Sequence, residues 1–345
     1  MKTRRRSILL GLVLLVFCLA CRWYTPAADF YAEYCYPWIS GGLSLAASVV
    51  PFSLEEITVL SFVFCFIVIL ISALRKKEGF LRLLRKTAVL VLWLFVWFYM
   101  GWGNNYYRTG LYRRNDIQRV NFERESFMRF LDDYARELNG AAAAAGTYDK
   151  EAFEAEIHAF YSDKVSAFGY TKLHGWQHTK RPLLNSLYSA VLVSGYTGPF
   201  FCETQVNLDL LEYEYPYVAA HEFAHLAGVT SEAEAGYWGF ACCRESENAA
   251  VRYSGYLSVL RYVISNAKDL LPQEDYQAWT ATLCEKAKAD YTEAAEYWKT
   301  KRVDWINDLQ GRFYDLYLRS NGVSEGTADY YGVVAMIMTM DAVKK

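Results

Sequence analysis

Uncharged apolar runs lie almost entirely within the first 104 residues, whereas the rest of the chain alternates apolar and charged positions as a soluble domain does. Residues 57–74 and 87–103 carry no charged side chain, and each run is long enough to cross a hydrocarbon layer about 30 Å thick. Residues 7–21 form a shorter apolar run behind a basic N-terminus, which fits either a spanning helix or the apolar part of a signal peptide. The pattern therefore predicts a membrane domain over residues 1–104, with spans at about 7–22, 57–74 and 87–103.

The loop between the last two spans is strongly basic. Residues 75–86 contain six lysines and arginines against one acid, Glu78. Because basic loops stay in the cytoplasm, this loop is expected inside, with residues 23–56 and the whole chain after the last span outside. We therefore expect a multi-pass protein of the cytoplasmic membrane, in contact with the lipid bilayer, whose C-terminal domain (residues 105–345) is extracytoplasmic.

This outer domain has mostly helical periodicity. Large apolar side chains recur three and four positions apart between residues 121 and 167, and after Pro216 helical spacing continues with short breaks to the C-terminus. Two short β-rich runs, residues 190–193 and 200–206, flank a loop with glycines and a proline, so we expect one small hairpin. The predicted fold class is mainly α: N-terminal transmembrane helices followed by a mostly helical domain with a small β-hairpin.

The clearest chemical pattern is HExxH, formed by His221, Glu222 and His225. Positions four apart project from the same face of a helix, so the two histidines can bind one Zn²⁺ through their imidazole nitrogens. Glu222 is rotated by about 100° from His221, which keeps it off the metal and beside a water that the metal activates. Metal-assisted hydrolysis requires this arrangement, with the carboxylate as general base.

A catalytic zinc needs a third protein ligand, and two carboxylates that follow the turn at Gly228 compete for this role. Ser231 and Glu234 match a capping box, which would engage Glu234 with backbone N–H groups. We therefore expect Glu232 as the third ligand, with Glu234 as the second choice.

Other features give weaker signals. His174 and His178 are also four residues apart, but they flank Gly175 and lack a neighbouring glutamate, so we interpret them as loop histidines. The net charge is −2, and no basic stripe that could bind the phosphates of DNA or RNA lies outside the membrane domain, so no nucleic-acid partner is expected. Five of the eight cysteines are expected outside, where disulfides are permitted, although the spacing does not indicate a pairing.

These residues resemble the gluzincin branch of zinc metallopeptidases and, more closely, an uncharacterised bacterial membrane-protein family, domain-of-unknown-function family 3810. The likeness runs along most of the chain, through residues 51–54, 195–199, 203, 206–207, 221–228, 232–235 and 252–256. It implies a zincin-like, gluzincin-type domain with His221, His225 and Glu232 as zinc ligands and Glu222 as general base. The family has no established activity, so the likeness implies no substrate.

The chain departs from this family pattern at position 236. Gly236 stands where the pattern has Asn and where related gluzincins have Asp. The residue at that position usually orients a ligand histidine by a hydrogen bond to the ring nitrogen that does not bind the metal. Loss of such a partner typically costs about 10- to 100-fold in metal affinity or activity.

The function expected from these observations is a membrane-anchored zinc-dependent metallopeptidase-like hydrolase, which cleaves a peptide or protein substrate on the outer side of the membrane. Residues 200–206 could pair with an extended peptide, and Tyr253, Tyr256, Tyr330 or Tyr331 could donate to the oxyanion. The alternative is a catalytically inactive zinc-binding envelope sensor or scaffold domain with the same fold. A third possibility is a structural membrane protein in which the motif is fortuitous.

Overall fold

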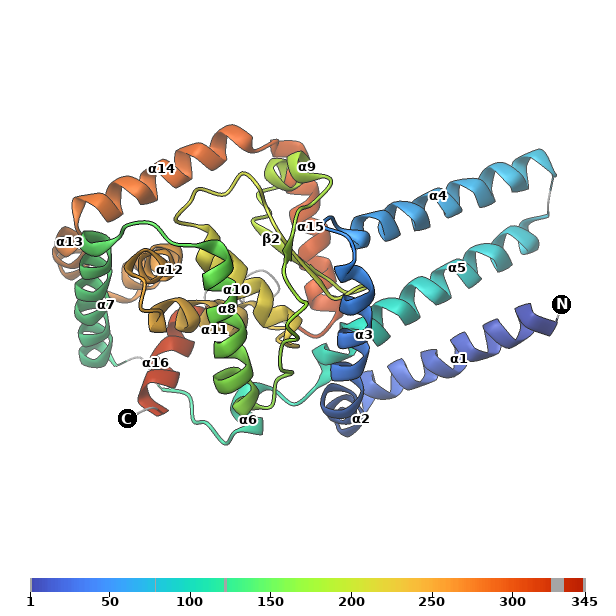
Figure 1. Cartoon of the computed structure of the whole chain (residues 1–345), viewed down its shortest axis with the longest axis horizontal. Coiled ribbons are helices and arrows are strands. Elements are labelled where there is room, and N and C mark those ends of the chain that lie inside the picture. The colour runs from blue at the N-terminus through green and yellow to red at the C-terminus, as the bar shows by residue number, and fades with distance from the viewer. Residues whose placement is uncertain (1, 78, 121–122, 324–331, 344–345) are drawn as a thin grey trace. The chain divides into compact units, whose positions relative to one another are not determined.

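The computed structural model describes residues 2–77, 79–120, 123–323 and 332–343, and it confirms a mainly α-helical chain with one small sheet (Figure 1). The chain divides into two compact units. Unit 1 comprises Met1–Thr109, His174–Leu183 and Thr197–Gln205, and unit 2 comprises Gly110–Leu173, Leu184–Tyr196 and Val206–Lys345. The units are not contiguous in sequence, because two later segments fold with unit 1.

Three helices of unit 1 are long and apolar enough to cross a membrane, which is compatible with a membrane protein. They are α1 (Lys2–Trp23), α4 (Leu54–Arg75) and α5 (Phe80–Gly101), and they coincide with the three predicted apolar runs. Within the unit α5 packs against both α1 and α4. α4 begins at Ser53, whose hydroxyl accepts a hydrogen bond from the backbone N–H of Glu56 over 3.1 Å, as an N-cap residue does.

The connection between the first two apolar helices is itself helical, although the sequence pattern indicated only a short outer loop. It contains α2 (Thr25–Phe30), the π-helical turn η1 (Tyr31–Cys35) and α3 (Tyr36–Ser48). A proline stands in the first turn of both α2 and α3, where its fixed φ favours a helix and its missing N–H is no loss. A 3₁₀ turn, η2 (Gly103–Tyr107), follows α5.

The sheet has three strands in the order β1 (Thr179–Lys180), β3 (Glu203–Val206), β2 (Gly195–Gly198). β1 is parallel to β3. The predicted first strand at residues 190–193 is wrong, because Ala190 ends α9 (Asn185–Ala190), a turn follows at residues 191–192, and the strand lies in the glycine-containing loop. Gly195 begins the observed strand, and a Cβ there would lie 2.6 Å from Cγ of Glu222, so glycine allows this close approach.

The position of β3 also corrects the expected substrate strand. β3 lies in the middle of the sheet order and all four of its residues are buried. An extended peptide therefore has no open edge of β3 to pair with, and the strands at the ends of the sheet order are β1 and β2.

The core of unit 2 is a set of packed helices around α11 (Glu232–Glu245). α11 packs against α10 (Tyr215–Leu226), α12 (Ala249–Leu270) and α16 (Val333–Val343), and α12 packs against α7 (Arg124–Ala144). The predicted apolar face of α7 is buried, with Phe127, Leu131, Tyr134 and Leu138 inside. These helices bury apolar faces from distant parts of the chain, and α10 with α11 positions the candidate site.

Unit 2 contains further helices along the C-terminal part of the chain. The helical spacing predicted after Pro216 is confirmed with breaks: residues 273–320 form three helices, because short extended links interrupt them at residues 283–284 and 302–303. The spacing near the C-terminus forms α16, and residues 324–331 lie outside the described residues. The remaining elements are α6 (Leu111–Arg114), α8 (Lys150–Phe160), η3 (Tyr161–Val165), η4 (Ser166–Phe168), α13 (Gln273–Thr282), α14 (Glu285–Lys301) and α15 (Asp304–Ser320).

Candidate metal centre

A sharp turn between α10 and α11 brings the candidate ligands together. Gly228 has a φ of 96° and closes α10 in a Schellman motif: its N–H donates to the carbonyl of His225 (2.9 Å), and the N–H of Val229 donates to the carbonyl of Ala224 (3.1 Å). Ser231 then caps the start of α11. The first residue of α11, Glu232, is thereby folded back onto the histidine face of α10.

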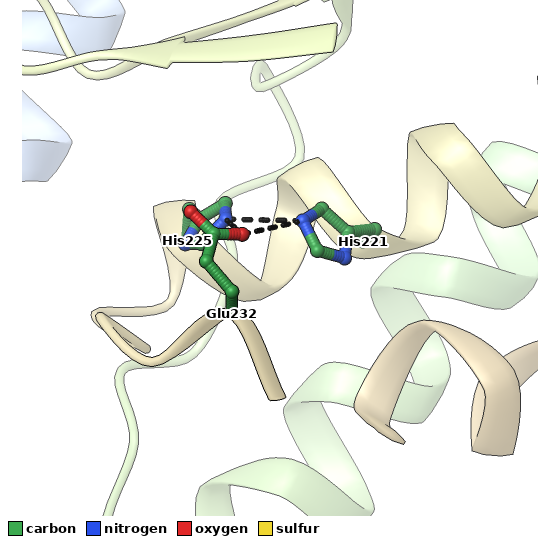
Figure 2. A group of neighbouring side chains, drawn as sticks. All are labelled: His221, His225 and Glu232. Atoms are coloured by element: carbon green, nitrogen blue, oxygen red, sulfur yellow. Dashed lines mark hydrogen bonds and ion pairs between the residues drawn. The ribbon is translucent and has the colours of Figure 1, made fainter. Parts of the chain in front are cut away.

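His221, His225 and Glu232 converge on one point, as Figure 2 shows. The Nε2 atoms of the two histidines are 3.2 Å apart. Oε2 of Glu232 lies 3.3 Å from Nε2 of His221 and 3.4 Å from Nε2 of His225. The three side chains expose only about a tenth of their surface, at 12%, 11% and 6% for His221, His225 and Glu232.

The size of this triangle matches a zinc site. A tetrahedral zinc at ~2.0–2.1 Å from its ligands holds those ligands ~3.3–3.4 Å apart. The observed separations of 3.2, 3.3 and 3.4 Å match the spacing of three ligands around one such ion. Two imidazoles and one carboxylate are also a donor set that catalytic zinc takes.

The two histidines differ in the hydrogen bonding of Nδ1, the ring nitrogen that faces away from the cluster. Nδ1 of His225 lies 2.8 Å from the carbonyl oxygen of Val229, so Nδ1 carries the proton and Nε2 offers its lone pair. Nδ1 of His221 is buried and has no hydrogen-bond partner among the described residues. At position 236, a Cβ on the glycine would lie 2.7 Å from Cγ2 of Val333 and 3.2 Å from the hydroxyl of Tyr217, so these two side chains occupy the space beside Gly236.

The charges of the cluster are strongly coupled. Burial lowers the pKa of His225, but the charge and hydrogen bond of Glu232, with a contribution from Glu222, outweigh burial and raise this pKa to about 9. Burial likewise raises the pKa of Glu232, and the two histidines outweigh it and hold that pKa well below its usual range. The buried carboxylate thus favours a positive charge at this point.

The two remaining glutamates of the motif have different surroundings. Glu222 is buried, and its side chain lies directly against the backbone of Gly195 at the start of β2. Glu234 accepts a hydrogen bond from the hydroxyl of Tyr170, and its backbone N–H donates to Ser231 over 3.2 Å. Of the two carboxylates that the sequence left in competition, the structure brings Glu232, and not Glu234, to the histidines.

The other candidates from the sequence lie elsewhere. His174 stacks its ring on Trp176 in unit 1, with centroids 4.5 Å apart. The hydroxyl of Tyr253 donates to Asp290 (2.6 Å), and Tyr256 packs its ring against Phe240. Tyr330 and Tyr331 lie outside the described residues. All eight cysteines are free thiols.

One residue of the centre was missed by the sequence pattern. The hydroxyl of Tyr314, on α15, donates a hydrogen bond to Oε1 of Glu232 over 2.5 Å. Tyr314 is one of 28 tyrosines and belongs to no motif, and 82 positions separate it from Glu232, so nothing in the spacing points to this contact.

Comparison with known proteins gives a family and no further relative. No curated protein and no solved structure matches the chain. Residues 31–338 match a family whose description is "Protein of unknown function (DUF3810)". Since this match extends from η1 to α16 and covers most of the sequence, the chain belongs to that family.

Proposed function

We propose that this chain is a membrane-anchored zinc-dependent hydrolase of peptide bonds. The observation that carries the proposal is the triangle formed by Nε2 of His221, Nε2 of His225 and Oε2 of Glu232, with sides of 3.2–3.4 Å. A structural zinc site closes all four positions with protein ligands, whereas a catalytic site keeps one open. The described cluster supplies three ligands, which favours catalysis.

The general base of the proposed reaction is Glu222. Zinc, when bound, supplies Lewis acidity at this point, which makes water a better nucleophile and a carbonyl a better electrophile. Glu222 is adjacent to His221 in sequence and close enough to influence the pKa of His225 by its charge. Its carboxylate accepts the proton of the attacking water and passes it to the departing amine.

The substrate in this proposal is an extended peptide that pairs with the start of β2. Gly195 lies against Glu222, and Tyr196 beside it is exposed. Main-chain hydrogen bonds to such a strand bind a peptide with little dependence on its side chains. A peptide held there would present its carbonyl groups close to the general base.

The proposed location is the outer side of the cytoplasmic membrane. Three helices of unit 1 have the length and apolar composition of spans, and the basic loop of residues 75–86 between two of them favours the cytoplasm. With three crossings, unit 2 would act on peptides or proteins outside the cell membrane.

The test uses the full-length chain in lipid nanodiscs, zinc analysis, and a peptide library read by mass spectrometry. We expect stoichiometric zinc and cleavage, with cleavage reduced at least about 100-fold in Glu222→Gln while zinc is retained. Glu285→Gln, which removes an exposed carboxylate on α14, is the matched control and should cleave like the unaltered chain.

Two other results would contradict the proposal. Stoichiometric zinc without cleavage of any library peptide would favour the inactive zinc-binding sensor or scaffold. A chain that binds no zinc would make the motif fortuitous.

A further inference from the structure

The two carboxylate oxygens of Glu232 have different surroundings. Oε2 faces Nε2 of His221 and of His225 at 3.3 and 3.4 Å, and is otherwise buried without a hydrogen-bond partner among the described residues. Oε1 points the other way and accepts the hydrogen bond of the Tyr314 hydroxyl over 2.5 Å. One oxygen is therefore available to a metal while a tyrosine holds the other.

This division matters because the terminal torsion of a glutamate is soft. Rotation about the bond to the carboxylate is broad and nearly two-fold, so packing alone does not decide which oxygen faces the histidines. A hydrogen bond to the ionised carboxylate is among the strong ones and fixes that torsion. Tyr314 comes from α15, so the bond also ties the first turn of α11 to a helix far along the chain.

The need for such a contact is greater here because another one is missing. His225 is oriented by the carbonyl of Val229, but Nδ1 of His221 has no partner among the described residues, and Val333 fills the space beside Gly236. Partners behind the ligands set both ligand orientation and metal affinity. With His221 unsupported, the orientation of the centre depends on Val229 and on Tyr314.

We propose that Tyr314 is a positioning residue of the metal centre, which holds Glu232 with Oε2 directed at the metal. The inference rests on the proposed zinc site. It assigns Tyr314 no contact with substrate and no proton transfer, so its effect is on the metal and not on the chemical step.

The experiment removes one hydroxyl. Tyr314→Phe is compared with Tyr317→Phe in the full-length chain in nanodiscs; Tyr317 lies one turn along α15 and stacks its ring on Tyr314 at 6.1 Å. Zinc dissociation constants are measured by competition with a chelator, and the visible spectrum of the Co²⁺-substituted chain reports ligand geometry. We expect Tyr314→Phe to weaken zinc binding about 10- to 100-fold and to alter the Co²⁺ spectrum, while Tyr317→Phe leaves both at the unaltered values.

A second background separates positioning from a general loss of packing. Glu232→Asp shortens the ligand by one methylene, so its carboxylate no longer reaches the Tyr314 hydroxyl in the same way. In this background Tyr314→Phe should add little further loss of zinc affinity, because coupled residues are not additive. Equal losses in the two backgrounds would overturn the proposal in favour of a packing role.

The remaining outcomes distinguish this inference from the proposed function. If Tyr314→Phe leaves the zinc affinity and the Co²⁺ spectrum unchanged, the positioning role is overturned. If it then reduces only the rate of cleavage, the hydroxyl is instead assigned to substrate binding. A zinc-affinity loss in a chain that cleaves no peptide would support Tyr314 as positioning residue and contradict the hydrolase. An unaltered chain without zinc would overturn both.

Discussion

The carbonyl oxygen of Val229 lies 2.8 Å from Nδ1 of His225, and the turn that ends α10 sets this contact. Gly228 supplies the left-handed residue of that turn, with a φ of 96°. Gly228, three residues after the second histidine of the HExxH motif, thus has a physical role at this site. Its left-handed conformation reverses the backbone so that the carbonyl of Val229 can orient His225.

Gly228→Ala should therefore weaken the metal centre through the backbone. A Cβ in the left-handed region costs about 1–2 kcal/mol, and relaxation of the turn would move the Val229 carbonyl away from His225. We expect a lower unfolding midpoint together with a zinc affinity reduced by about tenfold. Gly140→Ala on α7, where a Cβ would meet nothing within 4 Å, is the control. Unchanged zinc affinity in Gly228→Ala would show that the turn does not orient the ligand.

Zinc affinity should rise with pH over the neutral range. The pKa of His225 is raised to about 9 in the folded metal-free chain, so below that pH zinc must displace a proton from the imidazole. Competition titrations between pH 6.5 and 9 should show affinity increasing about tenfold per pH unit. A flat profile would contradict the protonated state of the empty cluster.

The same shift predicts the opposite trend for stability without metal. Because the folded pKa of His225, about 9, lies above its ordinary value of 6.5, its stabilisation is complete below 6.5 and is lost as pH rises through 9. The pKa of Glu232 is lowered, so its stabilisation is present above its usual range and is lost on acidification. Chelator-treated chain should lose thermal stability from pH 6.5 to 9, and His225→Ala should weaken this trend.

The asparagine that the family resemblance implies at position 236 should be tolerated only if space is made for it. Gly236→Asn forces a side chain against Val333 and should destabilise unit 2 by about 1–3 kcal/mol, as overpacking does. Val333→Ala removes the side chain nearest to this position, and we expect the double variant, with an amide that can support a ligand histidine, to bind zinc more tightly than Val333→Ala alone. If Gly236→Asn is neutral by itself, Val333 does not block the site.

The proposed orientation can be tested with reporter fusions. Alkaline phosphatase needs disulfides and is active only outside the cytoplasm. A fusion after Lys345 should be active, and one within the basic loop of residues 75–86 should be inactive, since that loop is expected inside. The reverse pattern would place unit 2 in the cytoplasm and exclude an extracytoplasmic substrate.

Much of the local structure followed from the sequence because periodicity and spacing are local signals. The three apolar helices, the inward face of α7 and the pairing of His221 with His225 depend on side chains within a few turns of one helix. The preference for Glu232 over Glu234 also came from a local feature, the cap at Ser231.

What the sequence did not predict depends on contacts between distant segments. Gly195 is typical of a loop, but it begins β2 and lies against Glu222, a residue from a distant segment. The contact of Tyr314 could not be predicted, because Trp305, Leu309 and Phe313 form the apolar stripe of α15 but are exposed, whereas Tyr314 contacts Glu232. From the hydrophobic pattern alone, the apolar face of α15 would be expected to be buried.

The zinc content of the full-length chain, purified without added metal, tests the proposed metal site most directly when it is compared with that of a His221→Ala, His225→Ala double variant. We expect one zinc ion per unaltered chain and essentially none in the double variant. Equal zinc in both proteins, or none in either, would contradict a metal centre formed by His221, His225 and Glu232.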